Sequence, residues 1–152
     1  MFNQPKVRRW MILLAATVSL ASSAAAGSKD LSDLLAAVGL ERDLKAGYIL
    51  RTDRWNGNLP PEGSKRIEYT LFQGNDYYFY AYSSTQGAKM TFHVQERDGT
   101  VVETRSWQKE QHALCFAGAE IQPKSTGTYQ LVVQVERSPQ ERTDWSLVYA
   151  FK

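Results

Sequence analysis

The strongest constraint on the fold is a period-two alternation of apolar and polar side chains, which recurs along the chain after Gly47. Neighbouring residues of a β-strand point to opposite faces, so each alternating segment can bury one face. The alternation is clearest in four segments: residues 66–72, 89–96, 128–136 and 144–152. Strands are also expected at residues 47–51, 77–83 and 100–107, and a weaker one at residues 113–121.

Seven or eight short strands separated by turns predict a mainly β fold. We expect a jelly-roll-like antiparallel β-sandwich over residues 47–152. Residues 55–63 (WNGNLPPEG) predict a loop. Asp98-Gly99 lies between two expected strands and predicts a tight type I′ hairpin turn, in which both central residues have positive φ.

Residues 27–46 differ from this pattern and predict one short amphipathic helix before the sandwich. Leu31, Leu34, Leu35 and Val38 fall at helical spacing and form one apolar stripe. Such a stripe needs an apolar surface to cover it, so the helix is expected to pack on the sandwich. The alternative is a free helix that binds a partner.

The first 26 residues have the order of a secretory signal peptide. Lys6, Arg8 and Arg9 precede an apolar run at residues 11–20, and small residues follow up to Ala26. The apolar run falls short of the roughly 20 residues that a membrane span needs. We therefore expect cleavage after Ala26 and a periplasmic or secreted protein.

Removing the signal peptide also changes the charge of the chain. Its three cations leave, and the formal net charge falls from +2 to −1. Without a basic block, nucleic acid is not an expected partner. No later segment is apolar and long enough to predict a membrane span.

The residues that could support catalysis are few. The chain has two histidines, His93 and His112, and one cysteine, Cys115. A lone cysteine excludes an intramolecular disulfide and a cysteine-based metal site, and a free cysteine is most often a small buried apolar side chain. His93 falls on the polar side of its strand, and no nucleophile–base motif accompanies either histidine. We predict no catalytic residue.

Two pairs of oxygen-bearing side chains are candidate metal ligands. They are Asn75 with Asp76, and Glu96 with Asp98. Both pairs lie in expected turns, where Asn and Asp are favoured because their side chains bond the local backbone. We predict no metal site and no cofactor.

The aromatic residues of segment 77–83 are the best candidates for ligand binding. Tyr78, Tyr80 and Tyr82 share one face of this strand, and Tyr77 and Phe79 share the other. One face must point to the core, so either the three tyrosines or Tyr77 and Phe79 point outward. A row of tyrosines could stack on a sugar or anchor a protein partner. The alternative is that the N-terminal helix or a long loop covers the row, because exposed apolar rows are uncommon on monomers.

Three segments carry a resemblance to a known family. Residues 71–79 (LFQGNDYYF), 94–102 (VQERDGTVV) and 126–133 (TGTYQLVV) resemble the strand–turn–strand opening, the central hairpin and a late strand of bacterial pre-peptidase C-terminal domains. The resemblance covers about residues 65–151 and implies a jelly roll that serves as an accessory module of exported proteins. Some related domains bind calcium or collagen through acids before the central strand, whereas here that strand begins Lys89-Met90-Thr91-Phe92.

These observations lead to one expected function and two alternatives. We expect an exported, non-catalytic module that binds a protein or glycan partner in the cell envelope. The first alternative is a structural or assembly subunit of an envelope complex, and the second is a hydrolytic enzyme.

The signal peptide gives the first testable prediction. Protein recovered from the cell envelope or the medium should begin at Gly27, because Ala24-Ala25-Ala26 supplies the small residues that precede a cleavage site. N-terminal sequencing measures this directly. A recovered chain that still begins at Met1 would contradict the prediction.

Overall fold

A computed structural model describes residues 46–111 and 114–152 of the chain. The described residues form eight β-strands and no helix. The strands are β1 (Ile49–Leu59), β2 (Ser64–Leu71), β3 (Tyr77–Ser83), β4 (Lys89–Gln95), β5 (Arg105–Gln111), β6 (Leu114–Ile121), β7 (Gly127–Arg137) and β8 (Thr143–Phe151). The mainly β fold expected from the alternation is confirmed.

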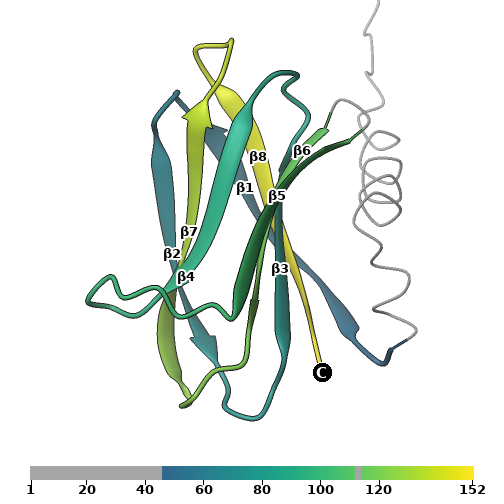
Figure 1. Ribbon diagram of the computed structural model, residues 1–152, viewed down its shortest axis with the longest axis vertical. Helices are drawn as coiled ribbons and strands as arrows, with labels where there is room; N and C mark the ends of the chain where they lie inside the picture. The colour runs from purple at the N-terminus through teal and green to yellow at the C-terminus, as the bar shows by residue number, and fades with distance from the viewer. Residues whose placement is uncertain (1–45, 112–113) are drawn as a thin grey trace, which may run out of the picture.

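The strands form two antiparallel sheets that pack face to face (Figure 1). The first sheet has the order β1-β8-β3-β6-β5, and the second has the order β2-β7-β4. The pairs β1–β8, β2–β7 and β3–β6 are nested inside one another along the chain. This nesting is that of one long antiparallel ribbon folded over into a sandwich, which is the jelly-roll arrangement.

The tip of the ribbon is the turn at Asp98-Gly99. Gly99 has a φ of 90°, and its N–H donates to the Glu96 carbonyl at 2.9 Å. Asp98 has a negative φ, since Glu62 is the one non-glycine residue with positive φ among those described. The predicted type I′ turn is therefore wrong in type. One positive φ, with Glu96 N–H bonded to the Thr100 carbonyl, fits a three-residue loop that ends in a glycine bulge.

After this turn, β5 does not pair with β4, which is the partner that the sequence predicts for it. The expected strand at residues 100–107 contributes one bridge to β4, between Gln95 and Val101. The chain then crosses to the other sheet, where β5 pairs with β6. The strand prediction at residues 100–104 is wrong, because Glu103 turns its carboxylate back to β4.

The core lies between the sheets and follows the predicted alternation. Ile67, Tyr69 and Leu71 of β2 face it, as do Met90, Phe92 and Val94 of β4. From the first sheet, the inward residues include Phe79, Ala117, Leu147 and Tyr149. Side chains from two inner faces interdigitate in this way in sandwiches.

The predicted loop at residues 55–63 is too long. Residues 55–59 continue β1 and pair with β8 from Trp55–Leu147 to Leu59–Thr143. Gly57 suits this strand because the Trp145 side chain packs closely against it. A Cβ at Gly57 would lie only 3.2 Å from Trp145 Nε1. Pairing with a neighbouring strand thus overrides the local turn preference of Asn-Gly-Asn. The loop itself begins at Pro60.

Two predictions concern residues outside the described ranges. The signal peptide at residues 1–26 and nearly all of the helical segment at residues 27–46 lie there. Within the described ranges, no helix has the length and apolar character that a membrane span requires.

The turn at Gly99 generates a stability prediction. Gly99→Val should lower the free energy of unfolding by about 1–2 kcal/mol, because a β-branched residue is strained at positive φ. Urea denaturation measures the change. Gly127→Val is the matched control, since a Cβ at Gly127 meets no atom within 4 Å and φ is not positive there. Equal stability of the Gly99 variant and the control would contradict the turn assignment.

Candidate functional site

The three predicted tyrosines lie on the outer face of the five-stranded sheet. Tyr80 and Tyr82 belong to an apolar cluster on that face, and Tyr78 packs against it. Tyr80 is 3% exposed and Tyr82 is 8% exposed. The structure therefore brings the three residues together, with two of them buried. Their role in ligand binding stays a prediction.

Tyr78 has polar contacts at the rim of this face. Its hydroxyl donates to Glu120 Oε1 at 2.9 Å, and Arg105 lies 3.1 Å from Glu120 Oε2. Burial and the hydrogen bonds of its hydroxyl raise the pKa of Tyr78 above its usual value. The hydroxyl thus stays protonated at neutral pH and holds the ring in one orientation.

Trp107 crosses the same face through a gap at Gly118. A Cβ at Gly118 would lie 2.4 Å from Trp107 Cζ2 and 2.6 Å from the Phe79 carbonyl oxygen. Without that Cβ, the indole reaches across β6 to Tyr80, with ring centroids 5.8 Å apart. Glycine at position 118 is therefore required by close packing.

A second candidate site lies along the edge of β4 that faces β5, and we call it the edge groove. Two side chains occupy positions there that a paired strand would fill. Glu103 Oε2 accepts from the Val94 N–H at 3.0 Å, and Gln108 Nε2 donates to the Met90 carbonyl at 2.6 Å. Glu103 also lies 2.7 Å from His93 Nδ1 and has a 5% exposed side chain. The ladder between β4 and β5 is thus replaced by side-chain hydrogen bonds.

Phe92 lies between these two bonded positions. Alternate residues of an antiparallel strand direct their N–H and C=O to the same side. Since Met90 and Val94 direct theirs to the β5 side, the backbone of Phe92 does so as well. No strand of the described ranges pairs with β4 there beyond the Gln95–Val101 bridge. The edge groove therefore contains an unpaired backbone segment.

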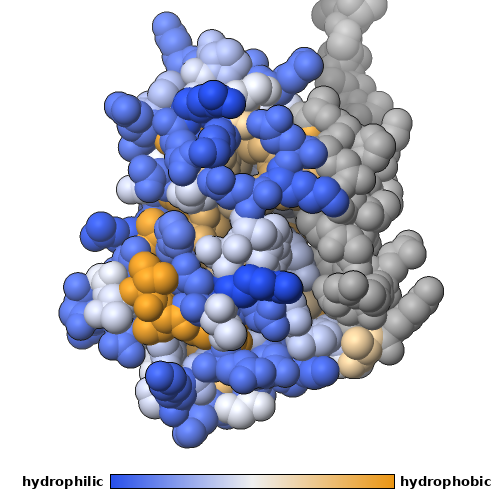
Figure 2. All heavy atoms as spheres, viewed as in Figure 1, coloured by the Kyte–Doolittle hydropathy of each residue, from blue (hydrophilic) through white to orange (hydrophobic). Residues whose placement is uncertain are grey.

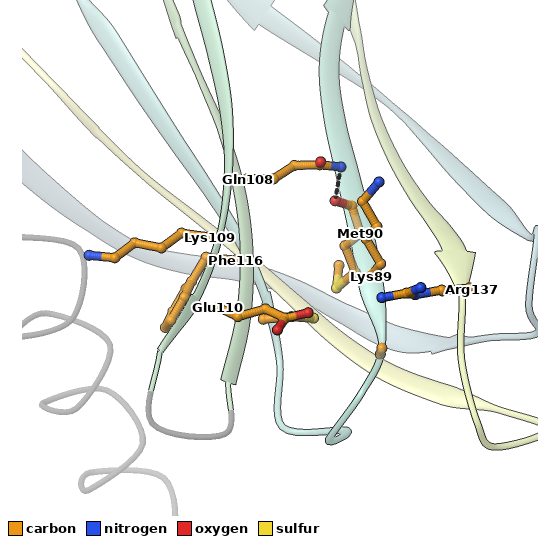
Figure 3. A pocket seen from close by; sticks show the side chains of 9 residues that line it. Lys89, Met90, Gln108, Lys109, Glu110, Phe116 and Arg137 are labelled. Atoms are coloured by element: carbon orange, nitrogen blue, oxygen red, sulfur yellow. Dashed lines mark hydrogen bonds between the residues drawn. The ribbon is translucent and has the colours of Figure 1, made fainter.

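Hollows flank this segment on the side of β5. One has a volume of about 340 Å³ and is lined by Thr91, Phe92, His93, Ser106, Trp107, Gln108 and Glu136. Another, of about 190 Å³, shares Gln108 with it and reaches Met90, Cys115 and Phe116. Figure 3 shows Glu110 and Arg137 reaching toward the mouth of the smaller hollow from opposite strands, with the Gln108–Met90 bond beside them.

A larger hollow of about 520 Å³ lies between the β4–β5 connection and the residues after β6. It is lined by Val101, Pro123, Lys124 and neighbouring residues. Val101 is 51% exposed. The face seen in Figure 2 is largely hydrophilic, with an apolar patch on its left side. Loops form most of this hollow, whereas strands frame the edge groove, so the edge groove holds its shape better.

Cys115 and His93, two of the three residues considered for catalysis, lie on different sheets. Cys115 is buried among the core residues, and burial raises the pKa of its thiol to about 11. His93 lies on the opposite sheet and contacts Glu103. Asp144 accepts hydrogen bonds from Ser83, Ser84 and Thr85; burial opposes its charge, yet these bonds hold its pKa below the usual value. His112 lies outside the described residues.

The turn carboxylates bond their own backbone. Asp98 Oδ1 accepts from the Thr100 N–H at 2.9 Å, and this bond lowers the pKa of Asp98. Asn75 Nδ2 donates to the Tyr77 hydroxyl. In the parts of the chain that the structure describes, no three metal-ligating side chains come together.

Sequence reasoning missed the edge groove. Glu103 and Gln108 lie in or beside a segment that the sequence predicts as an ordinary strand. The available signal was the break in alternation at Val101-Val102, followed by a run of polar residues. This break indicates that the segment is not a regular neighbour of β4.

Comparisons with known proteins give little similarity. No protein-family model and no curated protein sequence matches the chain. One similar solved structure is that of the lipase BlEst2 from Bacillus licheniformis in its propeptide form, with a TM-score of 0.45 and 11% sequence identity. The match covers 64% of this chain and 21% of the lipase chain, so the present chain spans about a fifth of the length of that protein.

The burial of Cys115 generates a reactivity prediction. At pH 8 a thiol-specific reagent should modify the folded protein on the order of 100-fold more slowly than the protein in denaturant, because a raised pKa and burial both suppress the reactive thiolate. The release of the reagent's chromophore gives both rates. Equal rates would contradict the buried, protonated state of Cys115.

Proposed function

We propose that this chain is an exported, non-catalytic β-sandwich module that binds a protein or glycan partner in the cell envelope. The signal-like N-terminus supports export. The resemblance to pre-peptidase C-terminal domains, which are accessory modules, agrees with the nested jelly-roll pairing. The proposal places the partner in the edge groove.

The observation that carries the proposal is the unpaired backbone of Phe92 between two occupied positions. An extended segment of a partner can add to an exposed strand edge, where its backbone supplies hydrogen bonds and its alternate side chains enter pockets. The two hollows beside Phe92, of about 340 and 190 Å³, would receive such side chains. A protein partner with an extended segment fits this geometry best.

A glycan is the other occupant that the groove admits. Trp107 lines the larger hollow, and an aromatic ring offers a flat surface for a sugar. The polar side chains of His93, Gln108 and Glu136 would then bond the sugar hydroxyls. The two occupants differ in their contacts, because a glycan would not pair with the backbone of Phe92.

The test is a titration of the isotope-labelled mature protein with a panel of extended peptides and a panel of soluble oligosaccharides. Peptide binding should shift the backbone amide resonances of residues 91–93 and 106–108. Ser106→Trp should weaken that binding at least about tenfold, because the indole would fill the larger hollow that Ser106 lines. Ser64→Trp is the matched control, since Ser64 is exposed on β2.

The outcomes separate the occupants. Shifts at residues 91–93 with peptides support a protein partner, and shifts around Trp107 with oligosaccharides alone support a glycan. If every binding signal falls outside the groove, or both tryptophan variants bind equally well, the placement of the partner in the edge groove is wrong.

A further inference from the structure

The outer face of the five-stranded sheet is covered by side chains that form a second apolar cluster, which we call the outer aromatic face. Its buried members are Tyr48, Tyr80, Tyr82, Phe116, Val148 and Ala150. Leu50, Tyr78, Trp107 and Leu114 pack against them. All of these residues belong to strands of that sheet, apart from Tyr48, which directly precedes β1.

This face is largely apolar, and apolar faces of this kind are rarely left open to solvent. Tyr80 is 3% exposed, and Phe116 and Val148 are each 2% exposed. Side chains that stand on a sheet shield each other's flanks, but their tips point away from the sheet. The second sheet contacts the opposite face, where Phe79, Ala117 and Leu147 pack with Phe92 and Leu131. Within the described ranges, no apolar residue from outside the five-stranded sheet packs on the outer aromatic face, apart from Tyr48.

The position of Tyr48 indicates where the cover comes from. Its ring meets Tyr78 edge to face at 4.8 Å, and Lys152 Nζ lies 4.6 Å from its centroid. The described part of the chain therefore begins beside this face. Residues 1–45 and 112–113 lie outside the described ranges, and two residues between β5 and β6 are too few to cover the cluster.

We propose that residues 29–44 form an amphipathic helix that docks its apolar stripe on the outer aromatic face. Leu31, Leu34, Leu35 and Val38 would replace water over the tyrosines. The stripe is about 10 Å long at 1.5 Å per residue. This matches about two interstrand spacings, the distance from β8 across β3 to β6. A helix this short is marginal alone in water, so docking would also stabilise the helix.

This inference does not depend on the proposed function, because the edge groove follows β4 of the other sheet and shares only Trp107 and Phe116 with the outer aromatic face. It does assign the tyrosine row a structural role. A docked segment leaves Tyr80 and Tyr82 unavailable to an external ligand, so a partner of this chain would have to bind elsewhere.

Hydrogen exchange of the unmodified mature protein is the first test. Backbone amides of residues 31–38 should exchange at least about 100-fold more slowly than in an unstructured peptide of the same sequence, because docking protects the helix. This measurement needs no variant and so cannot fail through misfolding. Exchange at the unstructured rate would overturn the proposal.

Leucine truncation in the full mature chain is the second test. Leu34→Ala and Leu35→Ala should each raise the equilibrium constant for unfolding by at least about 30-fold, as truncations of buried leucines do. Leu40→Ala is the matched control, because Leu40 lies in the same segment but outside the stripe. Equal effects at all three positions would contradict docking through the stripe.

A second copy of the chain is the competing cover for this face. Sedimentation of the mature protein separates the two cases. A monomer with protected residues 31–38 supports docking within one chain. A dimer whose protection at residues 31–38 falls on dilution would show that the cover comes from the other copy and would overturn the proposal.

Discussion

Strand β3 is buried on both faces, and the rest of the molecule is arranged around this constraint. Tyr77, Phe79 and Ala81 face the core between the sheets, while Tyr80 and Tyr82 are buried on the outer side. Strands of a two-layer sandwich usually alternate buried residues with solvated ones. A central strand with two apolar faces needs two covers. The sheet of β2, β7 and β4 supplies one, and the other has to cover the outer aromatic face.

The sequence predicts β3 well and its neighbours unevenly, for a physical reason. The predicted strand at residues 77–83 matches β3. Its start is predictable because Gly74 and the polar residues around it form a turn that separates β3 from the preceding strand. The loop prediction fails at residues 55–59 because β8 offers a paired edge that outweighs local turn preferences. Local sequence reports propensity, but it does not report which neighbour will be present.

The edge groove was harder to predict, since it depends on contacts between distant parts of the chain. Gln108 is an ordinary polar residue of a strand until β5 crosses to the first sheet and places its amide on the Met90 carbonyl, 18 positions away. The role of Glu103 is likewise visible only in the folded structure, where its carboxylate contacts both His93 Nδ1 and the Val94 N–H. Neither role follows from residue type or spacing, whereas the tyrosine row follows directly from the alternation of a strand.

The same contacts limit how a partner can use the groove. Val94 N–H and the Met90 carbonyl already have partners, so an added strand would gain new backbone bonds mainly at Phe92. Two such bonds contribute roughly 1–3 kcal/mol net, which is too little for a specific complex. Most of the affinity must then come from side chains that enter the flanking hollows. Glu103 and Gln108 also protect the edge of β4 against indiscriminate pairing with other chains, the usual hazard of an exposed strand. The proposed binding would therefore be selective, because a segment without matching side chains would gain little by binding there.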